Sequence, residues 1–168
     1  MKRKLGIVTL VLTAVFLLAA CNQQAATSQT SSPASTAKMT VTKADGTKTD
    51  VTMDTLTDMG IAKFTTKQAT SKTGPEENAH KGVLLKELLQ KIGVNTDKIT
   101  DILVTSTDGF SSVYSKAQLD DPDKLYLTYE MDCETLKDEG GKDVFYIIAK
   151  NEEFKQNWTK YVESIKIR

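Results

Sequence analysis

The feature that most constrains the fold of this chain is the uninterrupted apolar run VFYIIA at residues 144–149. A strand with one face in water alternates apolar and polar residues, whereas this run contains no polar residue. An unbroken apolar run is typical of a strand that is buried on both faces. We therefore predict that residues 144–150 form a central strand of a sheet.

Further strands are predicted on either side of this run in the chain. Residues 39–53 alternate and carry Asp45-Gly46 midway, which is a strong hairpin signal. Residues 62–72 also alternate and are rich in threonine, as expected of a half-exposed strand. The remaining predicted strands are residues 98–107, residues 125–131 and a closing strand in which Val162, Ile165 and Ile167 point inward in part.

One amphipathic helix is predicted over residues 81–93. Its apolar residues recur at helical spacing, so they form one face, and Gly93 ends the helix. We expect this face to pack on the sheet rather than to bind a partner. Its members are Leu84, Leu85, Leu88, Leu89 and Ile92.

Two shorter helices complete the predicted elements. One is capped by Asp54, and the other is capped by Ser115 and broken at Pro122. Strands and helices are interspersed without a regular strand–helix–strand alternation. The pattern therefore predicts an α+β fold with a mixed or antiparallel sheet and a few short helices.

The N-terminus carries a targeting signal. The basic residues MKRK precede an uncharged apolar stretch that is short for a membrane span. The stretch ends in Leu18-Ala-Ala-Cys21, which resembles the lipobox of bacterial lipoproteins. The resemblance implies a signal peptide at residues 1–20 and acyl chains such as palmitate on Cys21. The mature protein is then extracytoplasmic and lipid-anchored to the bacterial cell membrane. A secreted protein with a fortuitous cysteine, or an uncleaved anchor, is the alternative.

The rest of the chain divides into a tether and a domain. Residues 22–37 contain no charged and no large apolar side chain, so they cannot build a core. We expect residues 21–37 to form a flexible tether and residues 38–168 to form one domain. Three of the 22 basic residues precede Cys21, and no basic stripe with aromatic partners follows. Nucleic acid is therefore not an expected partner.

The chain has two cysteines, Cys21 and Cys133. If Cys21 is lipidated, Cys133 has no intramolecular partner and no disulfide supports the fold. A lone thiol outside the cytoplasm is either buried and inert or exposed and reactive. Burial is the prediction for Cys133.

The sequence lacks the motifs of metal and nucleophilic chemistry. His80 is the only histidine, no Cys-x-x-Cys occurs, and we expect His80 in an exposed loop. The acidic stretch at 120–123 lacks the glycine and glutamate of a calcium loop, so a solvated turn is expected. No Gly-x-Ser-x-Gly and no phosphate-binding glycine loop is present. We predict no catalytic and no metal-ligating residue.

Four segments, taken in order, resemble one known family. They are KGVLLKELLQKIGV (81–94), STDGFSSVYSKAQL (106–119), LYLTYEMDCETL (125–136) and NWTKYVESIKI (157–167). They are similar to the oxidoreductase molybdopterin-binding domain, the central domain of the sulfite oxidase family. The resemblance covers more than half of the chain and implies a sulfite-oxidase-like fold. It also implies a cleft in which a cysteine thiolate ligates molybdenum and basic residues hold the pterin phosphate.

The chain departs from that family at the positions that carry the chemistry. Residues 104–108 contain no cysteine where the resemblance places the metal ligand, and Arg168 is the only arginine after Cys21. Cys133 stands where the family usually has a glycine, at a turn position that can need a positive φ. The resemblance therefore implies a cofactor-less branch of the fold, with molybdopterin binding as the alternative.

The candidate ligand site is the loop TSTDGFSS at residues 105–112. Its hydroxyls, backbone amides and carboxylate suit a small polar ligand, although Asp108-Gly109 also fits a purely structural turn. Aromatic residues are the other candidates, and core packing is the alternative for Trp158. The candidate ligand-binding residues are Ser106, Thr107, Asp108, Gly109, Phe110, Tyr114, Tyr129 and Trp158.

Three functions are compatible with the sequence. The first is a non-catalytic module that binds a small ligand or an envelope protein. The second is a molybdopterin-dependent oxidoreductase or an electron-transfer accessory protein. The third is a structural envelope protein whose cleft is filled by its own side chains.

Overall fold

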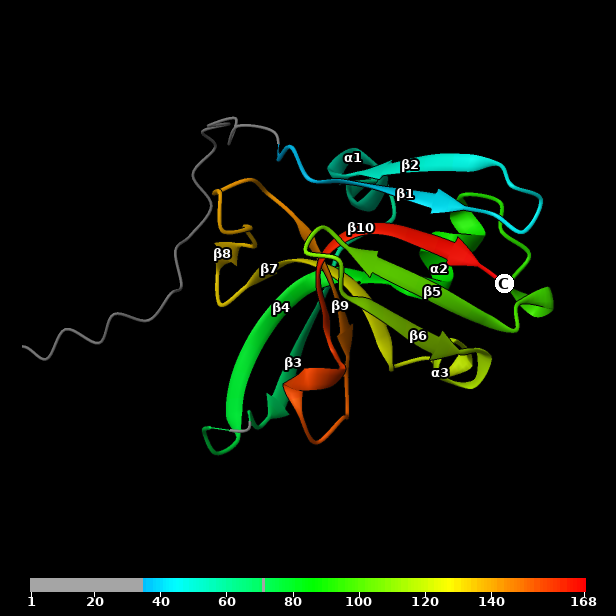
Figure 1. Cartoon of the computed structure of the whole chain (residues 1–168). Helices are drawn as coiled ribbons and strands as arrows, with labels where there is room; N and C mark the ends of the chain where they lie inside the picture. The colour runs from blue at the N-terminus through cyan, green and yellow to red at the C-terminus, as the bar shows by residue number, and fades with distance from the viewer. Residues whose placement is uncertain (1–34, 71) are drawn as a thin grey trace, which may run out of the picture. The chain divides into compact units, whose positions relative to one another are not determined.

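The structure is a computed structural model that describes residues 35–70 and 72–168 (Figure 1). The predicted signal peptide, the lipidated Cys21 and most of the predicted tether lie outside the described residues. Within the described ranges, no helix is both long and apolar enough to cross a membrane.

Strands dominate the described chain, and the helices are short. In chain order the elements are β1 (Lys38–Thr42), β2 (Lys48–Thr52), α1 (Met53–Thr57), β3 (Ala62–Gln68), β4 (Glu76–Leu84), α2 (Leu85–Lys91), η1 (Thr96–Lys98), β5 (Asp101–Ser106), β6 (Ser111–Ser115), α3 (Lys116–Asp120), β7 (Leu125–Met131), β8 (Glu134–Thr135), β9 (Phe145–Ala149), η2 (Lys155–Asn157) and β10 (Thr159–Ile167).

The sheet is mixed, and β9 lies at its centre. The strand order is β2-β1-β10-β9-β7-β4-β3, with β5 beside β10, β6 beside β5 and β8 beside β7. All five residues of β9 are buried, which confirms the predicted central strand. The pairing of β1 with β10 is parallel, and the other pairings are antiparallel. The predicted α+β fold with a mixed sheet and short helices is confirmed.

Strand β10 changes partners along its length. Its first residues pair with β9, and its last residues run between β1 and β5. Register shifts between Thr159 and Val162, and again between Val162 and Ser164, mark the crossover. Tyr161 lies within it at φ 53°. Bulges of this kind bend a strand, so the start of β10 is carried toward the β5–β6 turn.

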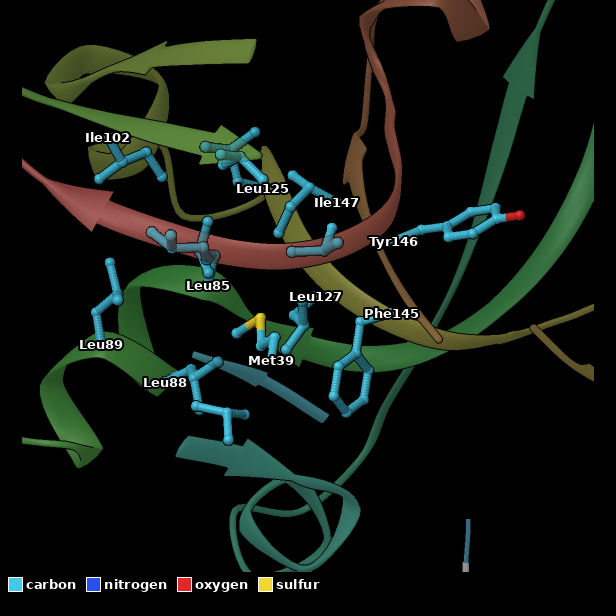
Figure 2. Close-up of a cluster of buried hydrophobic side chains, with 14 of the residues drawn as sticks. Met39, Leu85, Leu88, Leu89, Ile102, Leu125, Leu127, Phe145, Tyr146 and Ile147 are labelled. Carbon is cyan, nitrogen blue, oxygen red and sulfur yellow. The ribbon is translucent and has the colours of Figure 1, made fainter. Parts of the chain in front are cut away.

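The hydrophobic core lies between the sheet and α2. Figure 2 shows Leu85, Leu88 and Leu89 of α2 among buried side chains from strands of the sheet. Each of these leucines is fully buried, and such a side chain stabilises the fold by roughly 1.5–3 kcal/mol. The strand residues in the same cluster include Met39, Ile102, Leu125, Leu127, Phe145 and Ile147.

The helix predicted over residues 81–93 is only half helical. Residues 81–84 belong to β4, and the helix begins at Leu85. Gly82 pairs with Ala62 on one side and with Thr128 on the other. Pairing with β3 and β7 gives this segment backbone hydrogen bonds on both sides. These bonds favour a strand more than the spacing of the apolar residues favours a helix. Gly93 has φ 80° and follows the helix, as predicted.

The turn and cap predictions have mixed outcomes. Gly46 has φ 85° in the β1–β2 turn, as the Asp45-Gly46 signal predicts. Ser115 caps α3 with a reciprocal bond from Gln118, also as predicted. The prediction for α1 was wrong by two residues, because Thr52 is its N-cap and Asp54 lies in its first turn.

Candidate functional site

The predicted loop site is the tight turn between β5 and β6. The Ser106 N–H donates to the Phe110 carbonyl at 2.9 Å, and the Gly109 N–H donates to the Ser106 carbonyl at 3.0 Å. Gly109 has φ 85°, a conformation that glycine adopts without strain. Asp108 Oδ1 accepts from the Phe110 N–H at 3.0 Å and so closes the turn from inside. The expected structural role of Asp108-Gly109 is therefore present.

Two hydrogen bonds fix this turn to the beginning of β10. The buried Ser106 hydroxyl donates to the Lys160 carbonyl at 2.5 Å. The Thr107 N–H donates to the Tyr161 carbonyl at 2.9 Å. Because β10 bulges at this point, its backbone reaches the turn, and the two segments form one wall.

A hollow of about 360 Å³ opens beside the turn. Three distant segments line it: the chain just after β3, the β5–β6 turn and the chain from 154 to 160. We call it the turn hollow. Its lining residues are Ala69, Thr70, Ser106, Asp108, Phe110, Phe154, Lys155, Gln156, Trp158 and Lys160.

The turn hollow contains half of the predicted ligand-binding residues. Ser106, Asp108, Phe110 and Trp158 line it. Thr107 instead lines a smaller hollow with Asp138 and Tyr161, which shares Asp108 with the turn hollow. The other three do not line the turn hollow: they are Gly109 in the turn, Tyr114 in the core and Tyr129 on β7.

Tyr114 has a structural role in the core. Its ring is buried, its hydroxyl donates to the Asn157 carbonyl at 2.9 Å, and the Thr159 hydroxyl lies 2.8 Å away. Burial raises the pKa of this phenol. Tyr114 thereby ties β6 to the segment that carries Trp158.

Sequence reasoning missed the cationic and apolar wall of the turn hollow. Phe154 and Lys155 come from an irregular stretch before β10 and Lys160 from the start of β10, and none of the three was among the predicted ligand-binding residues. Lys155 Nζ is held by Glu76 at 3.0 Å and by Asn78 at 2.5 Å, and it lies 5.5 Å from the centre of the Trp158 ring. Phe110 is 52% exposed.

Behind the hollow lies a buried layer of aromatic and polar groups. The Trp158 ring meets the His80 ring edge-on at 5.5 Å, and His80 stacks on Phe64 at 5.0 Å. His80 Nε2 bonds the Thr66 hydroxyl at 2.9 Å. The prediction of an exposed loop histidine was wrong: His80 lies in β4 and is 2% exposed, because β4 extends past it and pairs with β3 and β7.

Burial lowers the pKa of His80 to about 4. The nearby Asp132 carboxylate acts in the opposite direction, and Lys155 adds to the lowering. The ring is therefore neutral at ordinary pH. His80 Nδ1 and Trp158 Nε1 are both buried and have no hydrogen-bond partner among the described residues.

The prediction that Cys133 is buried was also wrong. Cys133 is exposed and has φ 68°, directly after Asp132 at φ 53°. The two residues form the turn between β7 and β8, and Asp132 braces it by accepting from the Ala79 N–H at 2.8 Å. The positive φ agrees with the glycine that the resemblance led us to expect there.

Cys133 lines a second hollow of about 400 Å³, whose lining shares no residue with that of the turn hollow. Lys81 and Glu130 form an ion pair of 2.7 Å in its wall, and the bond to Glu130 raises the pKa of Lys81. The lining residues of this Cys133 hollow are Lys63, Phe64, Thr65, Ala79, His80, Lys81, Glu130 and Cys133.

The acidic residues at the end of α3 and just after it form ion pairs with lysines. Asp120 bonds Lys86 and Lys116, and Asp123 bonds Lys150. These bonds hold the pKa of both carboxyls below its usual value. In residues 35–70 and 72–168 no cluster of three or more histidine, cysteine or acidic side chains is placed to hold a metal ion.

The donor set of the turn hollow does not fit molybdopterin. Its lining offers hydroxyl, carboxylate, amide and ammonium groups but no sulfur, whereas the resemblance implies a cysteine thiolate as the molybdenum ligand. Cys133 lines the other hollow. Arg168 bonds Asp101 at 2.6 Å at the far end of β5. Among the described residues, the lining of the turn hollow therefore supplies neither a thiolate for the metal nor an arginine that would bind a phosphate.

The chain has an α+β fold that is molybdopterin-domain-like. The crystal structure of the sulfane dehydrogenase SoxCD from Paracoccus pantotrophus is similar, with a TM-score of 0.62 and 14% sequence identity. The match covers 78% of this chain and 38% of that chain, so this protein spans well under half of its neighbour's length. At this identity the likeness is one of fold. No protein-family model and no curated protein matches the chain.

Proposed function

We propose that this protein is a lipid-anchored, extracytoplasmic lipoprotein that binds a small ligand or a partner protein at the turn hollow without redox catalysis. The observation that carries the proposal is the composition of the hollow. Aromatic rings, hydroxyls, a carboxylate and two lysines line it, and a metal-ligating sulfur is missing from the lining. Apolar walls with a few placed polar groups are typical of ligand sites.

Two further points favour binding over the alternatives. A hollow of about 360 Å³ at residues 106–110 argues against a structural protein whose cleft is filled by its own side chains. The lack of a thiolate argues against a molybdopterin oxidoreductase. The lipobox-like Leu18–Cys21 sequence supports the proposed location at the outer side of the cell membrane.

The first test is elemental analysis and native mass spectrometry of the mature, lipidated protein, purified in detergent from a host that makes molybdopterin. We expect no molybdenum and, if the natural ligand is retained, an additional small mass. Molybdenum near one atom per chain would overturn the cofactor-less proposal. If the measured mass is that of the protein without a ligand, the next step is to screen for ligands.

The screen has a built-in reporter. Trp158 is the only tryptophan in the chain and lines the hollow, so a bound ligand alters its fluorescence. For an anionic ligand found in this way, Lys160→Gln should weaken binding about tenfold, because it removes one charge-assisted hydrogen bond. Lys142→Gln is the control, since Lys142 is exposed and does not line the turn hollow. If both variants changed the ligand affinity equally, the ligand would bind outside the turn hollow.

A further inference from the structure

Strand β6 is an open edge of the sheet. Among the described residues it pairs with β5 alone, and in Figure 1 it lies beside β5 on the side away from β10. An edge strand presents unpaired backbone groups to its surroundings. Which groups these are follows from the register of the β5–β6 pair.

The hydrogen bonds at the two ends of the pair fix that register. The Ser106 N–H donates to the Phe110 carbonyl, and the Lys116 N–H donates to the Thr100 carbonyl. Both bonds belong to the register in which Val104 faces Ser112. Bonded and non-bonded pairs alternate along antiparallel strands. The backbone groups of residues 112 and 114 therefore point toward β5, and those of residues 111, 113 and 115 point outward.

One of the three outward residues is already partly satisfied. The Ser115 N–H donates to Gln118 Oε1 at 3.0 Å as part of the α3 cap. The outward N–H groups of Ser111 and Val113 have no such partner among the described residues. Val113 is also 55% exposed, although it is a β-branched apolar residue.

The other long edges of the sheet are protected, and β6 is not. Strand β2 carries Lys48 and Asp50, and strand β3 carries Lys63 and Lys67. Charged residues of this kind discourage edge-to-edge pairing. The β6 sequence SSVYS has no charge and no proline.

We propose that β6 pairs with β6 of a second copy of this chain, antiparallel and centred on Val113. Each Val113 N–H then donates to the Val113 carbonyl of the other copy, and each Ser111 lies opposite a Ser115. Ser111 and Ser115, the outward residues on either side of Val113, are both serines, so the outward positions of the strand read the same in both directions and match in a two-fold antiparallel pair. The two valines form an apolar cross-strand pair. The result is one sheet that continues through both copies.

The test is site-specific disulfide crosslinking in the full chain, in membranes, with Cys133→Ser as background to remove the exposed thiol. Hydrogen-bonded antiparallel partners have Cα atoms about 5.5 Å apart, which suits a disulfide. Val113→Cys should therefore give a homodimer under mild oxidation. Ser111→Cys and Ser115→Cys are matched controls, because each would lie about 13 Å from its own counterpart. We expect at least tenfold less dimer from them.

A second measurement does not depend on a thiol. Val113→Pro removes an outward N–H and leaves the β5 ladder intact, whereas Val113→Thr keeps the N–H and the β-branched shape. By sedimentation of the detergent-solubilised full chain, the native protein and Val113→Thr should form dimers. Val113→Pro should dimerise about tenfold more weakly. A protein that stays monomeric, equal crosslinking at all three positions, or crosslinks only to other proteins would overturn the proposal.

Discussion

His80 is held as a neutral ring inside the protein. It is 2% exposed and packed between Phe64 and Trp158, and its pKa is about 4 compared with an ordinary 6.5. The unfolded chain therefore takes up a proton at His80 below about pH 6.5, and the folded chain does so only near pH 4. We expect the free energy of unfolding to fall by about 3 kcal/mol as the pH falls from 7 toward 4.

Urea unfolding across this pH range measures the effect, and His80→Gln isolates it. Carboxyls with a lowered pKa, such as Asp132, also cost stability in acid, but they are common to both proteins. The unfolding free energy of the native protein minus that of the variant should decrease as the pH falls through 6.5 to 4, because only the native protein loses the contribution of His80. A difference that does not change with pH would contradict a neutral, buried His80.

Gly82 is required by a close approach of two strands. A Cβ at this position would collide with the Leu127 carbonyl oxygen and would lie 2.9 Å from Thr128 Cα. Both neighbours are backbone and cannot rotate away. Gly82→Ala should therefore destabilise the protein by about 1–3 kcal/mol, as overpacking does. Thermal unfolding measures this, and Gly74→Ala, which meets nothing within 4 Å, should leave the melting temperature nearly unchanged.

At the scale of elements, the sequence predicted the strands, turns and caps that depend on a few neighbouring residues. The unbroken apolar run of β9, the Asp45-Gly46 turn and the Ser115 cap were each readable from a few neighbouring residues. Residues 81–84 were assigned to a helix because their leucine spacing continues into α2. Their strand pairing with Thr128 and Leu127 lies more than 40 residues away in sequence, so no local pattern reveals it.

The α3 cap gives a prediction at this scale. The Ser115 hydroxyl accepts from the Gln118 N–H, and the Gln118 side chain accepts from the Ser115 N–H. Ser115→Ala removes the first of these bonds and should lower the free energy of unfolding by about 1 kcal/mol. Chemical denaturation measures the loss. Ser111→Ala, at an exposed position on the same strand, should change it by much less.

At the scale of the whole molecule, the candidate site shows what sequence reasoning can and cannot reach. Its turn was predicted, because hydroxyls, an acid and a glycine are concentrated in eight residues. Apart from Trp158, its second wall was not, because Phe154, Lys155 and Lys160 are far from the turn in sequence and only the tertiary fold brings them to it. The same limit explains His80 and Cys133, whose exposure depends on how far β4 and β7 extend.

Attachment to the membrane is the prediction that involves the whole protein. The proposal assigns a lipid to Cys21, and more than one acyl chain gives stable anchoring where a single chain is marginal. Cells supplied with labelled palmitate should incorporate the label into the native protein and into Cys133→Ser, but not into Cys21→Ser. Mass spectrometry should find that the mature chain begins at Cys21 with a diacylglyceryl group. A mature chain that begins at another residue would identify a secreted protein with a fortuitous cysteine. A full-length, unlabelled chain in the membrane fraction would identify an uncleaved anchor, and either result would end the lipoprotein proposal while leaving the turn hollow to be tested separately.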